Sequence, residues 1–197
     1  MRPHPEESAE NGHLPDPDTE LIRLARDGDE AACHALVDRF APELYRLAYF
    51  LVGNAADAED VLQETFSGAF RHLGRFAELS SVRTWLCAIL VRQAARCRRR
   101  RKRQMISLEE GTGGASHGAV LVRDETSSAD LRMDLEAALD TLPEDHREVI
   151  VLRELIGLSY EEIAQTLDLP RGTVESRLFR ARRTLRERLK DYMPGIR

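Results

Sequence analysis

The stretch LIGLSYEEIAQTLDLPRGTVESRLFRARRTLRERL, residues 155–189, contains the signals for two short helices joined by a turn. Ser159, with Glu162 three residues later, is the pattern of a capping box at a helix start. Pro170 disfavours helix in the residue before it, so the first helix should end just ahead of that proline. A second helix should begin at about Gly172. The stretch therefore predicts a helix-turn-helix unit.

The second predicted helix has two faces of different character. With 100° per residue, one narrow stripe is apolar and contains Val174, Leu178, Ala181, Leu185 and Leu189. The opposite face is polar, basic and aromatic, and contains Ser176, Phe179, Arg180 and Arg183, with Glu175 at its edge. A helix that is apolar behind and presents arginines, a serine and a ring in front fits the major groove of DNA.

An ordinary pair of surface helices with a solvated basic face is the alternative interpretation of this stretch. Two features favour DNA over it. Phe179 places an apolar ring on the face that should be wet, where a thymine methyl group would suit it. Residues 171–190 also contain eight basic and two acidic side chains, within a chain whose net charge is −5.

The charge of the whole chain is unevenly distributed. A second basic run, Arg92 to Arg103, contains eight basic residues and no acidic one. Outside the two basic segments, 13 basic residues stand against 32 acidic ones. Two cationic patches in an acidic body predict nucleic acid at the patches and a cationic protein partner elsewhere.

Several classes of function are excluded by what the sequence lacks. Cys33, Cys87 and Cys97 are far apart and show no metal-ligand spacing, which indicates buried or idle thiols in a reducing compartment. No phosphate-binding glycine loop follows a strand, and no nucleophile motif occurs. We therefore expect no catalytic residue, no metal, no cofactor and no enzyme activity. The absence of a signal peptide and of a long apolar run predicts a cytoplasmic chain without membrane insertion.

The periodicity of the chain predicts two all-helical domains joined by a flexible linker, since no strand pattern persists. Residues 1–18 lack periodicity and should form a disordered tail. Residues 19–104 should form the first domain, residues 105–129 a linker rich in Gly and Ser, and residues 130–197 the second domain.

Acidic and amide side chains gather on the polar side of the helix expected from about Asp57 to Leu73. They are Asp57, Glu59, Asp60, Gln63 and Glu64. One interpretation is a helix start where the macrodipole favours acids. The other is an acidic docking face, because Asp60, Gln63 and Glu64 follow the i, i+3, i+4 spacing of one helix side.

A long helix capped by Ser80 or Ser81 should contain Trp85 and lead into the second basic run. A lone tryptophan at helical spacing is by default a core residue. Its place one or two turns before dense cations also suits stacking on an unpaired base. The arginine block needs a counter-charge, which phosphates would supply.

Two of these segments resemble a known family. The run Asp57-Ala-Glu59-Asp60-Val-Leu-Gln63-Glu64-Thr-Phe66 resembles the polymerase-docking segment of bacterial sigma factors. Residues 142–150, 158–164 and 172–182 resemble the C-terminal domain of the extracytoplasmic-function (ECF, group IV) subclass of the sigma-70 family. The likeness covers about residues 20–189, and the two motifs in this order are highly specific. It implies sigma region 2 at residues 19–104 and region 4 at residues 130–197.

The resemblance also implies a role for each surface. Polymerase-binding residues would be Asp57, Glu59, Asp60, Gln63 and Glu64, docked on the basic clamp helices of the largest polymerase subunit. Residues that bind and open the minus-ten element would be Trp85, Arg92, Gln93, Arg96, Arg99 and Arg100. Residues at the minus-thirty-five element would be Arg171, Thr173, Glu175, Ser176, Arg177, Phe179, Arg180 and Arg183, with Arg171, Arg177 and Arg183 nearer the phosphates.

The partners implied are core RNA polymerase, through its clamp helices and flap, promoter DNA, and an anti-sigma factor. The polymerase would perform the chemistry. A stand-alone helix-turn-helix regulator, binding a palindrome as a dimer, is the alternative. It explains the C-terminal half equally well but leaves the acidic face and the helix of Trp85 without a task.

The chain departs from the family at one position. Seven residues after the tryptophan the family often has an asparagine near the flipped base, and here Arg92 takes that place. Arginine lacks the donor–acceptor pair of an asparagine amide. The resemblance therefore extends to binding of the minus-ten element but not to its sequence preference.

Overall fold

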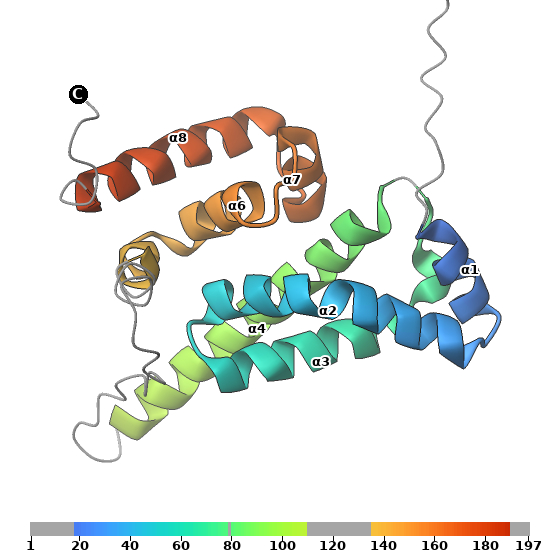
Figure 1. The fold of residues 1–197 in the computed structure, drawn as a ribbon. Coiled ribbons are helices and arrows are strands. Elements are labelled where there is room, and N and C mark those ends of the chain that lie inside the picture. The colour runs from blue at the N-terminus through green and yellow to red at the C-terminus, as the bar shows by residue number, and fades with distance from the viewer. Residues whose placement is uncertain (1–17, 79, 110–134, 190–197) are drawn as a thin grey trace, which may run out of the picture.

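A computed structural model describes residues 18–78, 80–109 and 135–189, and within these ranges every regular element is a helix (Figure 1). The elements in chain order are α1 (Thr19–Arg26), α2 (Glu30–Val52), α3 (Ala55–Arg71), the short 3₁₀ helix η1 (Leu73–Arg75), α4 (Val82–Glu109), α6 (Glu144–Glu154), α7 (Tyr160–Leu167) and α8 (Arg171–Arg188). Residues 135–140 are also helical. The predicted all-α class is confirmed, and the predicted tail falls almost wholly outside the described residues.

The ends of α2 follow from its capping residues. The Asp29 carboxylate accepts a hydrogen bond from the Ala32 amide at 3.1 Å, which satisfies one free donor at the helix start. Gly53 ends the helix with φ +82°, a left-handed conformation that glycine adopts without a steric penalty. Pro42 lies inside α2 and removes one backbone donor. The helix continues through it because a buried apolar stripe extends on both sides, from Leu36 to Leu51.

The long helix α4 begins as predicted and ends later than predicted. The Ser81 hydroxyl accepts a hydrogen bond from the Thr84 amide at 3.1 Å, so Ser81 rather than Ser80 is the cap. The helix continues to Glu109, five residues into the segment predicted as linker. The sequence RQMISLE at its end is composed mostly of good helix formers, which explains the extension. The rest of the predicted linker, residues 110–129, lies outside the described residues.

The helices form two groups that pack against each other. One group comprises α1 to α4 with η1, and the other comprises residues 135–140 with α6, α7 and α8 (Figure 1). Contacts between the groups run from α2 to α6 and from α4 to α7. Buried apolar residues of both groups belong to one continuous core, with Leu51 and Leu90 on one side and Leu152 and Leu158 on the other. This packing brings the two domains together.

None of the helices in the described part of the chain is both long and apolar enough to span a bilayer. All three cysteines are free thiols, with Cys87 and Cys97 buried and Cys33 half-buried.

Candidate nucleic-acid and protein interfaces

The helix-turn-helix unit is formed by α7, a short turn and α8. At its start, the Ser159 and Glu162 side chains each bond the backbone amide of the other, so the predicted capping box is present. Asp168 ends α7 in the left-handed conformation with φ 53°, and Pro170 then precedes the first residue of α8. Asp and Asn tolerate this conformation better than most non-glycine residues, and proline suits the boundary of the next helix. The residues of the turn thus suit the conformations that they adopt.

The two faces of α8 lie as the periodicity predicts. Val174, Leu178 and Ala181 are buried against the domain, and Leu185 and Leu189 are half-buried. The outward face consists of exposed side chains, namely Glu175, Ser176, Phe179, Arg180 and Arg183. The Phe179 ring is 68% exposed. Contact of a large apolar ring with water is unfavourable, so this exposure is typical of a surface that a partner covers.

The arginines of α8 fall into two classes. Arg171 bonds both Glu161 and Glu175, and Arg177 pairs with Asp145 of α6 at 3.3 Å. Arg180 and Arg183 form no ion pair with a described residue, so their charges are available to an anion outside the protein. Thr173 is half-buried near the start of the helix, one residue beyond the exposed Gly172.

Arg182 of α8, to which the sequence analysis assigned no role, connects three helices. Arg182 donates to the Glu154 carboxylate at 2.7 Å and to the Tyr160 hydroxyl at 3.3 Å, which joins α8 to α6 and α7. The hydrogen bond to Glu154 is the main cause of the raised pKa of the Arg182 guanidinium. Its partners are 28 and 22 positions away in the chain, so local pattern contains no signal for the contact.

The predicted acidic face lies on the outer side of α3. Glu59, Asp60, Gln63 and Glu64 are exposed, whereas Asp57 is half-buried. The Asp57 amide and carboxylate both bond the capping residue Asn54, at 2.9 and 2.7 Å. Asp57 therefore takes part in the helix start, and the other four residues form the available face.

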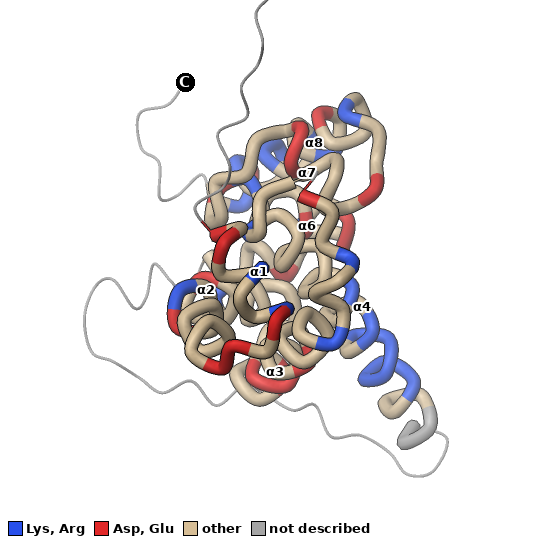
Figure 2. The backbone as a smooth tube through the Cα atoms, turned by 90° about the vertical axis from the view of Figure 1, so that its right-hand side faces the viewer, with Lys and Arg blue, Asp and Glu red and all other residues tan. Residues whose placement is uncertain are grey.

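The predicted minus-ten residues spread along α4. Arg92, Arg96, Arg99 and Arg100 are exposed, and Gln93 is half-buried. Figure 2 shows Lys and Arg gathered along the C-terminal part of this helix. Trp85 is half-buried and packs on Phe76, with ring centroids 5.3 Å apart and a tilt of 56°. The tryptophan thus has a core contact and also some exposed area.

The acidic face of α3 and the basic side of α4 border one polar groove. It has a volume of about 540 Å³ and is lined by Asp60, Gln63 and Glu64 on one side and Gln93, Arg96 and Arg100 on the other. Across it, Arg100 and Asp60 form a loose ion pair at 3.9 Å. An exposed pair at this distance contributes little stability. Both surfaces therefore remain open to partners.

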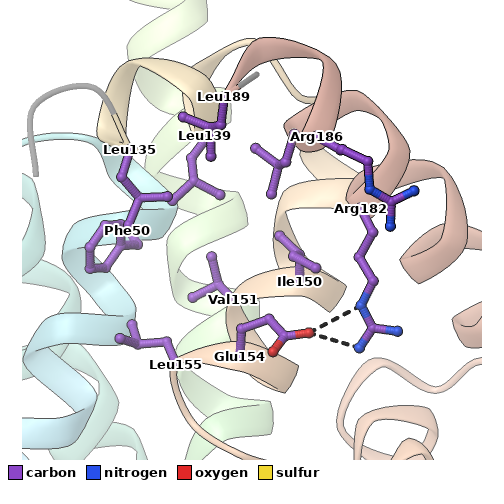
Figure 3. A pocket seen from close by; sticks show the side chains of 11 residues that line it. Phe50, Leu135, Leu139, Ile150, Val151, Glu154, Leu155, Arg182, Arg186 and Leu189 are labelled. Carbon is purple, nitrogen blue, oxygen red and sulfur yellow. Dashed lines mark hydrogen bonds and ion pairs between the residues drawn. The ribbon is translucent and has the colours of Figure 1, made fainter. Parts of the chain in front are cut away.

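A second, apolar groove lies between the two domains (Figure 3). Its volume is about 560 Å³, and its apolar walls are formed by Phe50, Leu135, Leu139, Ile150, Val151, Leu155, Leu185 and Leu189. Arg182, Arg186 and Glu154 lie at its rim. Leu135 is 38% exposed there. An apolar floor with charged residues at its rim is the form of a groove for an amphipathic helix.

Two family models match the chain in succession. Sigma-70 region 2 matches residues 36–104, and Sigma-70 region 4 matches residues 132–185.

Full-length relatives show the same family. The ECF RNA polymerase sigma-E factor of Escherichia coli K12 is 36% identical over 184 residues, which cover 89% of this chain and 96% of the relative. The RNA polymerase sigma-H factor of Pseudomonas aeruginosa is 35% identical and covers 89% of this chain and 95% of the relative. The ECF factor SigE of Mycolicibacterium smegmatis is 40% identical, and this chain spans 65% of its length.

Solved structures share the arrangement of both domains. CnrH in complex with the cytosolic domain of CnrY matches with a TM-score of 0.68 and 28% identity, covering 89% of this chain and 99% of that one. RpoE of Bartonella quintana, in complex with the anti-sigma factor NepR, matches with a TM-score of 0.66 and 28% identity, covering 80% and 96%.

Proposed function

The chain belongs to the sigma-70 family, in its extracytoplasmic-function class, and from this premise we propose that it binds core RNA polymerase and directs it to promoters. The observation that carries the proposal is the succession of a region 2 match and a region 4 match along one chain. The alternative, a stand-alone helix-turn-helix regulator, is not favoured, because it accounts for the second match alone. The polymerase supplies the catalysis, and the chain itself contributes none. The site of action is the cytoplasm, where the polymerase lies.

The exposed acids of α3 are the proposed docking surface for the clamp helices of the polymerase. Glu59, Asp60, Gln63 and Glu64 are exposed and presented by a single helix. A basic coiled coil would meet them with complementary charge, which speeds encounter and fixes orientation. Asp57 supports this surface by bonding Asn54, the cap of the helix that presents it.

The basic side of α4 is the proposed minus-ten surface. Arg92, Arg96, Arg99 and Arg100 would hold the phosphates of the separated strand, and Trp85 with Gln93 would contact its bases. Trp85 retains exposed area beyond its contact with Phe76. Strand opening needs both a stacking surface and cations, and this helix presents both.

The outward face of α8 is the proposed minus-thirty-five surface. Glu175, Ser176, Phe179 and Arg180 would contact base edges in the major groove, where arginine pairs with guanine and an apolar ring with the thymine methyl group. The residues nearer the phosphates would be Arg171, Thr173, Arg177 and Arg183. Release of Arg171 from its two glutamates would accompany this contact.

Run-off transcription with purified core polymerase on a randomised promoter library tests the function. We expect transcripts that depend on the added chain and share two sequence elements upstream of their start. Transcription that is unchanged by the chain would contradict the proposal. Dimeric footprints on naked DNA, without association with core polymerase, would instead support the regulator.

We also propose an anti-sigma factor as a partner, with an amphipathic helix of that factor in the apolar groove. Two similar structures, CnrH and RpoE, are complexes with such proteins. The groove offers apolar walls and, at its rim, Arg186 beside the Arg182–Glu154 pair, which suits an apolar helix with an acidic residue facing Arg186. Once the factor is identified by co-purification from the native cell, its purified cytosolic segment should inhibit run-off transcription. Leu135→Arg in the sigma chain should weaken that inhibition, and undiminished inhibition would place the helix elsewhere.

A further inference from the structure

One arginine of the basic run faces the other domain instead of solvent. The Arg98 side chain is 14% exposed, whereas its neighbours Arg99 and Arg100 are exposed. Its guanidinium donates to the Glu148 carboxylate of α6 at 2.7 Å and to the Leu51 carbonyl of α2 at 3.1 Å. The Glu148 side chain is itself 16% exposed. A charge pair of this burial joins the two domains directly.

A second set of polar contacts joins the domains near the start of α4. Arg83 of α4 bonds Glu43 of α2 and also the Ile156 carbonyl, which lies between α6 and α7. The neighbouring Thr84 hydroxyl, itself 2% exposed, donates to the Glu162 carboxylate of α7 at 3.3 Å. The two sets lie about four helical turns apart along α4, so they hold the second domain at both ends of the interface.

The two packed domains are together too short to span the distance between the two promoter elements. The minus-ten and minus-thirty-five elements are separated by about 25 base pairs, or roughly 85 Å at 3.4 Å per pair. A compact body of about 150 residues has a radius of gyration near 15 Å and is roughly 40 Å across. Surfaces that belong to one such body do not reach both elements at once. The domains must separate before both can bind.

We propose that the Arg98–Glu148 contact, together with the Arg83 contacts, is a latch that holds the free chain closed and promoter-incompetent until polymerase opens it. This inference rests on the proposed function for the two promoter elements, but the latch itself is a property of the free chain. It assigns Arg98 to regulation and not to phosphate binding. Because polymerase binds only the open form, its apparent affinity for the free chain is lowered in proportion to the fraction of chains that are open.

Removal of one partner from a partly buried ion pair leaves the other charge poorly solvated, so the domain equilibrium should shift toward the open form. Arg98→Ala leaves Glu148 without its hydrogen-bond donor in the closed form, with Arg177 as the remaining nearby cation, whereas water solvates Glu148 in the open form. We expect at least a tenfold shift toward the open form. The apolar contacts between α2 and α6 remain, so the variant samples both forms.

Small-angle X-ray scattering of the full chain, free in solution, tests the latch. Arg98→Ala should have a radius of gyration larger than that of the wild type by about a fifth or more, while Arg46→Ala should match the wild type. Arg46 is an exposed arginine on α2 and belongs to none of the proposed surfaces. Equal radii for Arg98→Ala and the wild type would overturn the proposal, whether both are compact or both extended.

Helix content by circular dichroism separates opening from unfolding. If Arg98→Ala loses helix, Glu148→Lys becomes the deciding variant, since it sets a cation against Arg98 across the interface. A helical Glu148→Lys with a radius larger than that of the wild type supports the latch. A helical Glu148→Lys as compact as the wild type refutes it.

Binding to core polymerase tests the regulatory consequence. Arg98→Ala should bind core polymerase about tenfold more tightly than the wild type, and Arg46→Ala should bind as the wild type does. An opened variant with unchanged affinity would refute the role of the latch as a barrier. A wild-type chain that fails to support run-off transcription would refute the proposed function, while the scattering result would still decide whether the latch exists.

Discussion

Ser159 and Glu162 satisfy each other's backbone at the first turn of α7. The Ser159 hydroxyl accepts from the Glu162 amide at 3.2 Å, and the Glu162 carboxylate accepts from the Ser159 amide at 2.8 Å. Because Glu162 also receives the Thr84 hydroxyl, the start of the helix-turn-helix unit is tied to the first domain. The capping box thus fixes both a local helix and its neighbour.

Ser159→Ala should lower the free energy of unfolding by about 1 kcal/mol, because one amide at the start of α7 loses its acceptor. Urea denaturation followed by circular dichroism measures the change. Ser67→Ala, at an exposed position inside α3, is the control and should change stability by less than about 0.5 kcal/mol. Equal effects of the two variants would contradict the importance of the cap.

Arg180→Ala should weaken promoter binding by the polymerase–sigma complex by about 1–3 kcal/mol and relax base preference at one upstream position. Arg177, held by Asp145, should behave as a phosphate contact. Its replacement by alanine should weaken binding equally for all sequences and reduce the salt dependence. Binding to a promoter library at two salt concentrations distinguishes the two results. Unchanged selectivity in Arg180→Ala would count against a base contact.

Asp60→Arg should abolish association with core polymerase, because it opposes a cation to the basic clamp helices. Helix content should stay at the wild-type level, since Asp60 is exposed. Asp38→Arg makes the same charge change at an exposed position on α2, outside the docking surface, and should still associate. Normal association of Asp60→Arg, measured by co-elution with polymerase, would remove the docking assignment.

The Cys87 thiol should resist labelling in the folded chain. Burial is the main cause that raises the pKa of Cys87 to about 12, with Glu43 adding to the rise and Arg83 opposing it. The reactive thiolate is therefore scarce at pH 7 to 9. Mass spectrometry after treatment with a thiol reagent should show modification of Cys87 only in denaturant. Rapid modification of Cys87 without denaturant would show that the interior opens readily.

The raised pKa of Cys87 also predicts the direction in which the stability of the fold changes at high pH. The folded chain keeps the Cys87 proton above the pH at which the unfolded chain releases it, so stability falls as pH rises from about 9 toward 12. Cys87→Ala should remove up to one proton from the slope of unfolding free energy against pH in this window. A slope unchanged by the substitution would contradict the shift.

Local sequence patterns predicted those structural features that depend on residues close together in the chain. The capping box at Ser159, the serine cap of α4 and the apolar stripe of α8 all follow from spacing within a few residues. Positions determined by tertiary contact were not predicted. Arg98 has the same local appearance as the arginines beside it, although the buried positions Leu90, Val91, Ala94 and Cys97 place it on the inward side of α4. Helical phase is therefore the signal that would have identified it.

The end of α4 was predicted too early in the chain. Composition predicted linker from Met105, because glycine and serine follow soon afterwards. The helix extends to Glu109, since the intervening residues favour helix and nothing in them stops it. A helix continues until a residue that disfavours helix occurs, and the first glycine after Met105 is Gly111.

The apolar groove has a thermodynamic consequence. Phe50 of α2 forms one wall. The remaining apolar walls come from residues 135–140, from α6 and α8, and from Leu155 and Leu189, which follow these two helices. The groove is therefore complete only while the domains touch, and a molecule seated there has greater affinity for that conformer. The two effects are linked. Domain contact raises the binding constant of the molecule by some factor, and binding of the molecule raises the equilibrium constant for domain contact by the same factor. An inhibitor of this kind would contact the inward side of α8 but would not need to cover its outward face, because it would act by shifting the balance between conformers.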